Sequence, residues 1–558
     1  MSEQNVQKTS KNGRFTKAEK SWILYDWANS VYATNMLAAI FPIYYASVAG
    51  DAGDKWWGIG VAIASFFVAI TAPFLGSIGD FHGMKKRLFA CFAIGGMAFT
   101  AITAFAGSWQ LMLIGYVLSH IGFSGANVFY DSFLTDVTTR ERMDKVSAWG
   151  YAMGYLGGST IPFVISIAVL LATDFSQTAV RASILLTTVW WAVFSIPIFR
   201  NVKQTHFVDT PPAQLASAAL RNLRHTLGDI VRRKGLLLFL VAYFFYIDGV
   251  NTVISLATNY GATLGLGSTG MILALLITQL VAIPCAILFS KLAAKVGSVR
   301  MIGSAIAVYF CICSVGFFMG QNVEPYQLEY TALVEQVTAS AEFTPGSADE
   351  RVWQQVADDL KEDGRDALAA KDRPAAFYTV KADGTPDGVI GDVIARLKDA
   401  DNTHYAFSDE VARTGALAVI EDTVKPALLA FAADGAKQTA YTEALGLSSL
   451  LFWLMAVLVG TVQGGIQALS RAYYGKLIPA HRSNEFFGFY DIFGKFAAVI
   501  GPFLYSVFYM LTGRASIGII SLMVLFILGG VILLLGRKQL QQAEQEASLA
   551  AEECAAES

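Results

Sequence analysis

Apolar residues gather into runs of about twenty along most of the chain, and polar segments separate the runs. A helix needs about 20 apolar residues to cross the hydrocarbon core of a bilayer. Measured against that length, the pattern predicts twelve membrane-spanning helices and hence an all-α membrane protein. The expected spans are residues 22–48, 57–79, 87–107, 110–133, 146–172, 181–199, 236–258, 268–290, 300–320, 447–470, 486–510 and 515–536.

The polar segments differ sharply in their content of lysine and arginine. If the N-terminus is placed in the cytoplasm, the inner segments together hold 26 of these residues. The short outer loops then hold only Lys55, Arg181 and Arg514. Membrane proteins keep an excess of lysine and arginine on the cytoplasmic side. The pattern therefore predicts that both termini are cytoplasmic.

Two longer polar segments interrupt the spans. Residues 201–234 carry leucines and one isoleucine at helical spacing among arginines. Such an amphipathic helix either lies on the inner leaflet or serves only as a tether between two halves, and we favour the tether. Residues 321–445 face outward and are expected to form a small, acidic, mainly helical domain. The expected segments are a cytoplasmic tail 1–20, a six-helix bundle 21–200, a linker 201–234, spans seven to nine at 235–320, the insertion 321–445, spans ten to twelve at 446–536, and an acidic cytoplasmic tail 537–558.

Composition supports a membrane protein and argues against other classes. Hydrophobic residues make up 54% of the chain, charged residues 15%, and the mean hydropathy is +0.48; a soluble protein carries about 25% charged residues. The net charge of −3 and the lack of a basic block argue against a nucleic-acid partner. No cysteine has metal-ligand spacing with histidine, so we expect no metal site, no cofactor and no catalytic centre. Residues 1–20 contain no apolar core, so the first span is expected to be the targeting signal.

One short motif occurs twice. Asp26, Asn29, Ser30 and Val31 match Asp248, Asn251, Thr252 and Val253 at an offset of 222. A second match, at an offset of 340, pairs Arg142, Gly154, Pro162 and Phe163 with Arg482, Gly494, Pro502 and Phe503. The two offsets differ by about the length of the insertion. The pattern therefore predicts two related six-helix halves, the plan of parallel-repeat transporters.

The repeated motif places a carboxylate inside the membrane, where it needs a partner or an aqueous cavity. Residues three or four apart share one face of a helix. One such face should carry Asp26, Asn29 and Ser30, followed along the span by Tyr32, and its counterpart Asp248, Asn251 and Thr252. We expect both to line a central cavity and to bind a polar substrate or a proton. The alternative is that the two aspartates cap hydrogen bonds between helices.

Further polar residues lie on spans ten and eleven. Gln463 and Gln467 occur at helical spacing with Ser470 and Arg471, and are second candidates for the cavity. Asp491 and Lys495 are four residues apart, so they either neutralise each other or bind a ligand that carries both charges. Span four also holds polar residues one turn apart, with a histidine above them: Asn127, Asp131 and His120.

The loop after span two combines glycines with charged residues. Its glycines allow two helix ends to approach closely, and its aspartate can pair with groups across the cytoplasmic face. Such contacts would hold one conformation and break in another. The expected gating residues are Gly76, Asp80, Gly83, Lys85, Lys86, Arg142 and Arg482.

This loop resembles the signature of the major facilitator superfamily at Gly76, Asp80, Gly83, Lys85 and Lys86, although His82 stands where an arginine is usual. The segment Leu24-Tyr25-Asp26-Trp27-Ala28-Asn29-Ser30 is similar to the hallmark of one branch of that superfamily. The branch contains bacterial "unknown major facilitator" proteins and fungal, autophagy-linked vacuolar amino-acid effluxers. Residues 243–250, 463–471 and 485–490 resemble it as well.

The resemblance implies the major facilitator fold of two pseudo-symmetric six-helix bundles and secondary transport by alternating access. We therefore expect a transporter of a small polar, amino acid-like solute in a bacterial inner membrane, with export as the fungal precedent and proton coupling as a hypothesis. The substrate and the oligomeric state stay open. A receptor or scaffold acting through residues 321–445 is the alternative.

Overall fold

The computed structural model describes residues 14–174, 176–208, 215–399 and 401–557. Within them, 12 helices or helix runs are long and apolar enough to cross a membrane, and each overlaps one predicted span. Most of the predicted N-terminal tail and residues 209–214 of the linker lie outside the described residues. The predicted all-α membrane fold is confirmed.

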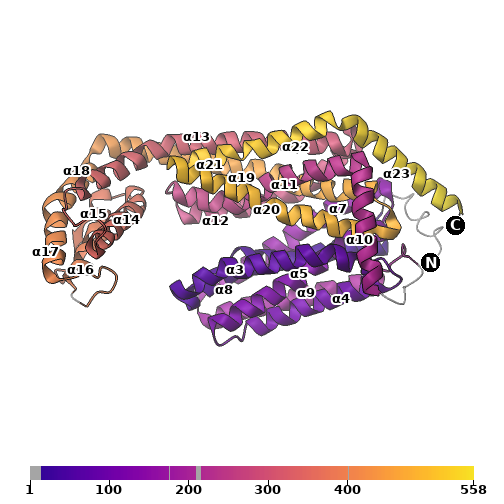
Figure 1. The fold of residues 1–558 in the computed structure, drawn as a ribbon, viewed down its shortest axis with the longest axis horizontal. Helices are drawn as coiled ribbons and strands as arrows, with labels where there is room; N and C mark the ends of the chain where they lie inside the picture. The colour runs from indigo at the N-terminus through magenta and orange to yellow at the C-terminus, as the bar shows by residue number, and fades with distance from the viewer. Residues whose placement is uncertain (1–13, 175, 209–214, 400, 558) are drawn as a thin grey trace.

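The first half of the chain forms one bundle, coloured indigo to purple in Figure 1. Thr16 begins it with a reciprocal cap, because its hydroxyl accepts from the Glu19 N–H while the Glu19 carboxylate accepts from the Thr16 N–H. The elements are α2 (Lys17–Tyr32), η1 (Ala33–Ala38), α3 (Ile40–Gly79), α4 (Met84–Thr103), α5 (Trp109–Ser132), α6 (Leu134–Val137), η2 (Arg140–Arg142), α7 (Met143–Met153), η3 (Gly154–Thr160), α8 (Ile161–Ala172) and α9 (Gln177–Asn201).

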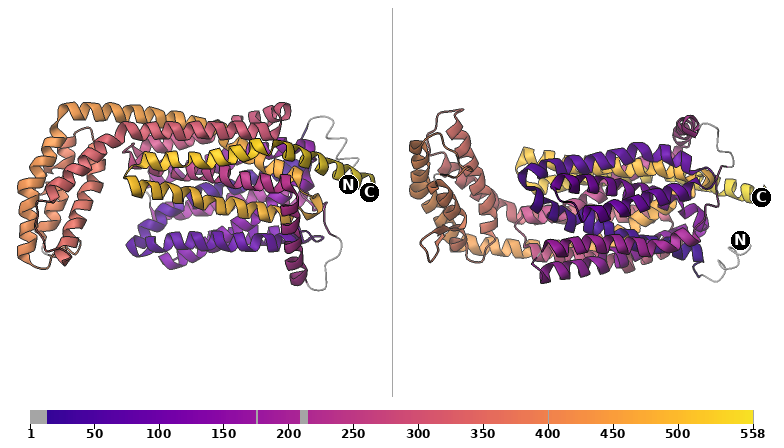
Figure 2. Two further views of the ribbon diagram at one scale, coloured as in Figure 1. Left: turned by 45° about the horizontal axis from the view of Figure 1, so that its top comes forward. Right: turned by 90° about the horizontal axis from the view of Figure 1, so that it is seen from below.

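The second half forms a bundle beside the first. Its elements are α11 (Lys234–Thr263), α12 (Ser268–Val296), α13 (Ser298–Thr338), α19 (Gly435–Leu477), η5 (Ala480–Arg482), α20 (Ser483–Thr512), α21 (Ala515–Ser521) and α22 (Met523–Leu535). Two helices lie outside both bundles, α10 (Leu215–Arg232) in the linker and α23 (Arg537–Glu557) in the C-terminal tail. Both ends of the described chain lie at one end of the molecule, which we call the termini end (Figures 1 and 2).

The segment between spans nine and ten extends from the opposite end of the second bundle, as Figure 2 shows. Helices α13 and α19 contain 41 and 43 residues, about twice the length that a bilayer requires. The predicted boundaries at 321 and 445 therefore fall inside continuous helices. Between them lie α14 (Ala348–Leu368), α15 (Arg373–Phe377), β1 (Thr379–Val380), β2 (Pro386–Asp387), α16 (Gly388–Lys398), α17 (Glu410–Val419), η4 (Ile420–Val424) and α18 (Lys425–Ala433).

The helix after α7 is locally widened where α2 crosses it. Segment η3 is a short π-helix that contains three glycines. A Cβ on Gly157 would lie 1.8 Å from the Trp27 ring, and one on Gly158 would lie 2.3 Å from Ser30. Larger side chains would therefore push α2 away. These glycines allow the helix that carries Asp26 to pack against the middle of span five.

Candidate functional site

Arg471, on α19 of the second bundle, lies at the centre of a polar cluster between the two bundles. Its side chain is only 3% exposed. Its Nη1 donates to Asp131 Oδ1 at 2.8 Å, and its Nη2 donates to Asp26 Oδ2 at 3.3 Å. Its Nε donates to the Ser147 hydroxyl at 3.0 Å. One cation of the second bundle thus binds two carboxylates of the first.

Aromatic rings enclose this cluster. The guanidinium lies 4.5 Å from the Tyr151 ring centroid, 4.7 Å from that of Trp22 and 5.5 Å from that of Tyr130. An arginine over an aromatic face is attracted by the ring quadrupole, more strongly when water is excluded. The Tyr130 hydroxyl also donates to Asp26 at 2.7 Å. The rings therefore shield and support the ion pair together.

Two carboxyl groups share one cation in this cluster. Asp26 and Asp131 both contact the single guanidinium of Arg471. Asp131 keeps one carboxylate oxygen outside the ion pair, and its side chain is 25% exposed. Asp491 and Lys495 form their own pair, at 3.4 Å, on α20. Asp131 is therefore the more accessible of the two carboxyl groups that bind Arg471.

The other predicted residues of span one turn toward the first bundle. Asn29 donates to the Asn127 side chain at 2.6 Å, and Ser30 packs against the backbone of η3. Tyr32 is fully buried and shares a hydrogen bond of 2.7 Å with Ser119. The predicted face is therefore divided, with Asp26 directed at the second bundle and its neighbours at the first.

Asp248 occupies different surroundings, although the predicted repeat pairs it with Asp26. Both of its carboxylate oxygens lie 3.0 Å from the backbone N–H of Gly501 on α20, and the Thr252 hydroxyl donates to it at 3.3 Å. Gly501 precedes Pro502, which lacks an N–H and interrupts the helix ladder. Asp248 thus caps a break in its own bundle, and the described residues show no ion pair to it.

The remaining candidates lie at the seam between the bundles or near it. Tyr155, of span five, donates weakly to Gln467 of span ten at 3.5 Å. Gln463 is 8% exposed beside the same tyrosine. Asn251 is half-buried on α11, one turn from Asp248. Among the described residues, no hydrogen bond or ion pair joins the Asp26 face directly to the Asp248 face.

The gating loop brings the two bundles together at the termini end. Asp80 accepts from the backbone N–H groups of Asn484 and Glu485, at 2.9 and 3.1 Å, where α20 begins. A Cβ on Gly76 would lie 2.5 Å from the Asn484 carbonyl oxygen, so only glycine fits. Lys85 pairs with Asp136 at 2.6 Å and donates to the Ser483 hydroxyl at 2.9 Å. Backbone and side-chain contacts of this loop therefore connect the two bundles directly at the termini end.

Burial raises the pKa of the Asp80 carboxyl to about 7, although Lys85 and the backbone donors act in the opposite direction. Gly83 adopts a left-handed conformation, with φ of 73°, at the turn into α4. Lys86 donates to the carbonyl of Val202 within the first bundle. These residues shape the loop, whereas Asp80 and Lys85 reach the other bundle.

Arg142 and Arg482, paired by the predicted repeat, bind different partners. Arg142 makes a two-pronged ion pair with Glu19, at 2.8 and 2.9 Å, inside the first bundle. Arg482 pairs with Asp229 of the linker helix α10 at 2.8 Å. A further link between the bundles was not predicted, in which Asp144 accepts from Lys476 at 2.6 Å and from Ser298 at 2.8 Å.

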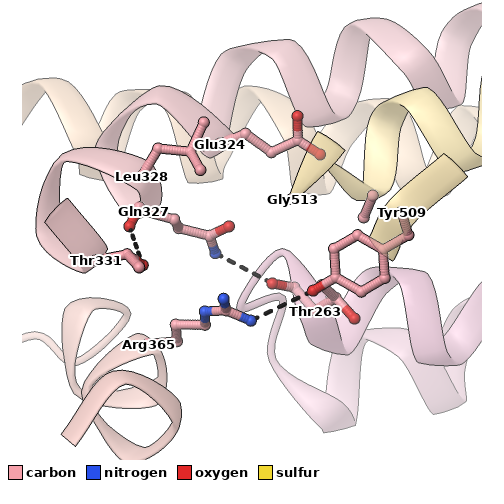
Figure 3. A pocket seen from close by; sticks show the side chains of 9 residues that line it. Thr263, Glu324, Gln327, Leu328, Thr331, Arg365, Tyr509 and Gly513 are labelled. Carbon is pink, nitrogen blue, oxygen red and sulfur yellow. Dashed lines mark hydrogen bonds between the residues drawn. The ribbon is translucent and has the colours of Figure 1, made fainter. Parts of the chain in front are cut away.

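A separate pocket lies where the segment between spans nine and ten meets the second bundle (Figure 3). Its empty volume is about 270 Å³, open solvent included. Gln327 donates to the Thr263 carbonyl at 3.1 Å, and Arg365 of α14 donates to the Tyr509 hydroxyl at 3.4 Å. These bonds attach the segment to the bundle. None of the predicted site residues lines this pocket.

Asp26 was predicted as a site residue from the sequence, whereas its partners in the cluster were not. Arg471 and Asp131 are conspicuous as charges within apolar runs, and that signal could have joined them to Asp26. Tyr130, Tyr151 and Ser147 carry no such signal, because polar aromatic and hydroxyl residues are common in spans. No group of three or more potential metal ligands occurs among the described residues.

A family model described as "Vacuole effluxer Atg22 like" matches residues 59–140, 135–323 and 435–548. The chain belongs to the Atg22-like family. Residues 324–434, most of the segment between spans nine and ten, lie between the matched parts. "Uncharacterized MFS-type transporter YxiO" of Bacillus subtilis (strain 168) is 35% identical over 534 residues, which cover 93% of this chain and 95% of that protein.

More distant relatives match shorter parts. "Autophagy-related protein 22" of Yarrowia lipolytica (strain CLIB 122 / E 150) is 26% identical over 136 residues, 21% of this chain and 23% of that protein. A solved bacterial homologue of the iron transporter ferroportin, in an outward-facing state, is 11% identical with a TM-score of 0.49, covering 95% of this chain and 98% of that chain.

The family match and the Bacillus relative establish the class of this Atg22-like protein. It is an integral membrane transporter of the MFS type, and the predicted family is confirmed. The same relatives favour transport over the alternative of a receptor or scaffold.

Proposed function

We propose that this protein is a secondary active transporter that exports a small amino acid-like solute by alternating access. The observation that carries the proposal is the cluster in which Arg471 of one bundle binds Asp26 and Asp131 of the other. The family description, a vacuole effluxer, supports export. The excess of lysine and arginine at the termini end supports a cytoplasmic location for that end, in a bacterial inner membrane.

The ion pair is a contact that alternating access must break. When the bundles separate at the termini end, Arg471 moves away from Asp26 and Asp131. A buried carboxylate left without a partner is costly. The ammonium group of a substrate can take the place of the guanidinium on Asp131. Lys495 can leave its pair with Asp491 and bind the carboxylate of the same solute. A zwitterion therefore stabilises the state in which the bundles have parted.

Asp248 is the residue to which we assign the coupling proton. Its donors, the Gly501 N–H and the Thr252 hydroxyl, are neutral and belong to the same bundle. A proton on this carboxyl removes a buried charge without breaking a contact between the bundles. Asp26, in contrast, binds the guanidinium of Arg471 in the other bundle, so a proton on it would weaken a contact between the bundles. Coupling and substrate recognition would then use different aspartates.

Flux in proteoliposomes tests the proposed function. Vesicles loaded with a mixture of amino acids, peptides and sugars should lose one or more neutral amino acids through the reconstituted protein, measured by mass spectrometry. Efflux should quicken under an inward proton gradient. Arg471→Gln should stop the efflux. Arg514→Gln, which replaces an exposed arginine outside the cluster, is the matched control and should leave the efflux unchanged. If vesicles that hold the intact protein lose no solute, the proposed function is contradicted. If the rate of efflux does not depend on a pH gradient, transport is not coupled to protons.

A further inference from the structure

The linker helix α10 has an exposed side that neither bundle covers. Thr226 and Ile230 are buried, and Leu223 packs against the second bundle's core. Leu227 and Val231 are instead 52% and 56% exposed. At 100° per residue, these two side chains lie about a quarter-turn from the buried side.

Basic residues follow the exposed apolar residues around the helix. Arg221, Arg224 and Arg232 are all exposed, and by the same rotation they lie beyond Leu227 and Val231, away from the bundle. Around α10 the order is therefore a buried side, an exposed apolar flank and a basic strip. Helices that lie in a membrane interface have this arrangement, with apolar residues toward the acyl chains and arginines at the headgroups.

The position of α10 fits the same interface. The helix runs crosswise to the spans at the termini end and stands outside the bundles (Figures 1 and 2). On the flank opposite Leu227, Asp229 pairs with Arg482, in the segment just before α20 enters its span. Asp229 thus faces the turn between α19 and α20 at the termini end, and the apolar flank lies on the other side of α10.

We propose that α10 is a binding site for anionic phospholipids and that its occupation keeps the termini end closed. Arg221, Arg224 and Arg232 bind the headgroups, while Leu227 and Val231 enter the leaflet. Lipid binding at α10 acts on the contact between the bundles through Arg482. This arginine joins α10 to the start of α20, where the backbone N–H of Glu485 donates to Asp80. Since α10 also packs on α3, it bridges both bundles.

Melting of the full-length protein in nanodiscs tests the site. In phosphatidylcholine discs with a rising share of phosphatidylglycerol, the melting temperature should rise, and high salt should reduce the gain. Each arginine near an anionic surface strengthens binding roughly fivefold. The combined variant Arg221→Gln, Arg224→Gln and Arg232→Gln should therefore need a far larger share of phosphatidylglycerol for the same gain.

A control variant separates local binding from net charge. Lys371→Gln, Lys381→Gln and Lys398→Gln remove the same charge from exposed positions on the outward segment, and should keep the wild-type response. An unchanged response in the arginine variant, or an equal loss in the lysine control, would overturn the proposal.

Depth measurement provides a readout that does not depend on melting. A fluorophore on Leu227→Cys, with the native cysteines replaced, should be quenched by lipids that carry a nitroxide near the headgroup. The same label on His225→Cys, an exposed residue of the same helix, should be quenched less. Equal quenching at the two positions, or none at Leu227, would show that α10 does not insert its apolar flank.

Discussion

The two bundles carry the same motif and put its aspartate to different uses. In the first, Asp26 leaves its own bundle to meet Arg471 of the other. In the second, Asp248 stays within its bundle and caps the N–H of Gly501. A contact between the bundles must break when they move, whereas a contact within one bundle can persist. In the proposed function, Asp26 therefore makes the contact that breaks, and Asp248 carries the coupling proton.

The loops after spans two and eight, at the termini end, also differ in how many contacts they make with the opposite bundle. The first-half loop makes several contacts with α20, through Gly76, Asp80 and Lys85. The corresponding second-half turn contributes the Ser298 hydroxyl, which donates to Asp144. The stronger of the two latches is therefore on the first bundle.

The largest effect is expected from removing the cation between the bundles. Arg471→Met leaves Asp26 and Asp131 buried without a partner, which costs about 3–5 kcal/mol of folding free energy. The melting temperature of the variant should fall markedly, and its transport of solute should stop. Adding Asp26→Asn and Asp131→Asn should restore most of the stability but not transport. If Arg471→Met alone is as stable as the wild type, the contact between the bundles at Asp26 does not have the importance assigned to it.

The next effect separates the two aspartates. Asp248→Asn can still accept from the Gly501 N–H, so the free energy of unfolding should change by less than about 1 kcal/mol. Proton-driven accumulation should disappear while solute exchange at equal pH continues. Asp26→Asn, the matched change in the first bundle, should impair both. If Asp248→Asn retains the pH-driven step, the proton lies elsewhere.

A smaller effect is expected at the latch of the first bundle. The methyl group of Gly76→Ala meets the Asn484 carbonyl, and overpacking of this kind costs about 1–3 kcal/mol. The termini end should open, widening the distance between spin labels at Arg87→Cys and Lys291→Cys, which are exposed on opposite bundles. Gly95→Ala, where nothing lies within 4 Å, is the control. Equal behaviour of the two variants would rule out a tight latch at Gly76.

The smallest effect is a pH dependence from Asp80. The closed state holds its proton up to about pH 7, whereas an exposed aspartate in the open state releases it near pH 4. Between pH 4 and pH 7, a falling pH should shift the equilibrium toward the closed state, by at most about a factor of ten per pH unit. Above pH 7 the equilibrium should no longer depend on this carboxyl group. The same spin labels should report this change. Asp80→Asn should abolish it, and a dependence that survives in this variant belongs to another group.

Most of the fold follows from the sequence, because runs of about twenty apolar residues have one stable arrangement in a bilayer. Asp26 was also identifiable, since an intramembrane carboxylate requires a partner. Arg471 is likewise conspicuous as a charge within an apolar run. Its pairing with Asp26 was not predicted, because 445 residues separate the two and the spacing of a motif does not show which side chains meet between bundles. The division of the predicted face among Asp26, Asn29 and Tyr32 likewise depends on how neighbouring helices pack.

Binding of an amino acid and of its N-acetyl derivative tests most directly whether a substrate ammonium replaces Arg471 on Asp131. Titration calorimetry on the purified protein should show heat with the amino acid that the flux assay identifies. The acetylated form, which lacks the positive charge, should bind at least about tenfold more weakly, a difference of 1.4 kcal/mol. Asp131→Asn should abolish this preference. Equal affinity of the wild type for both compounds would contradict the account.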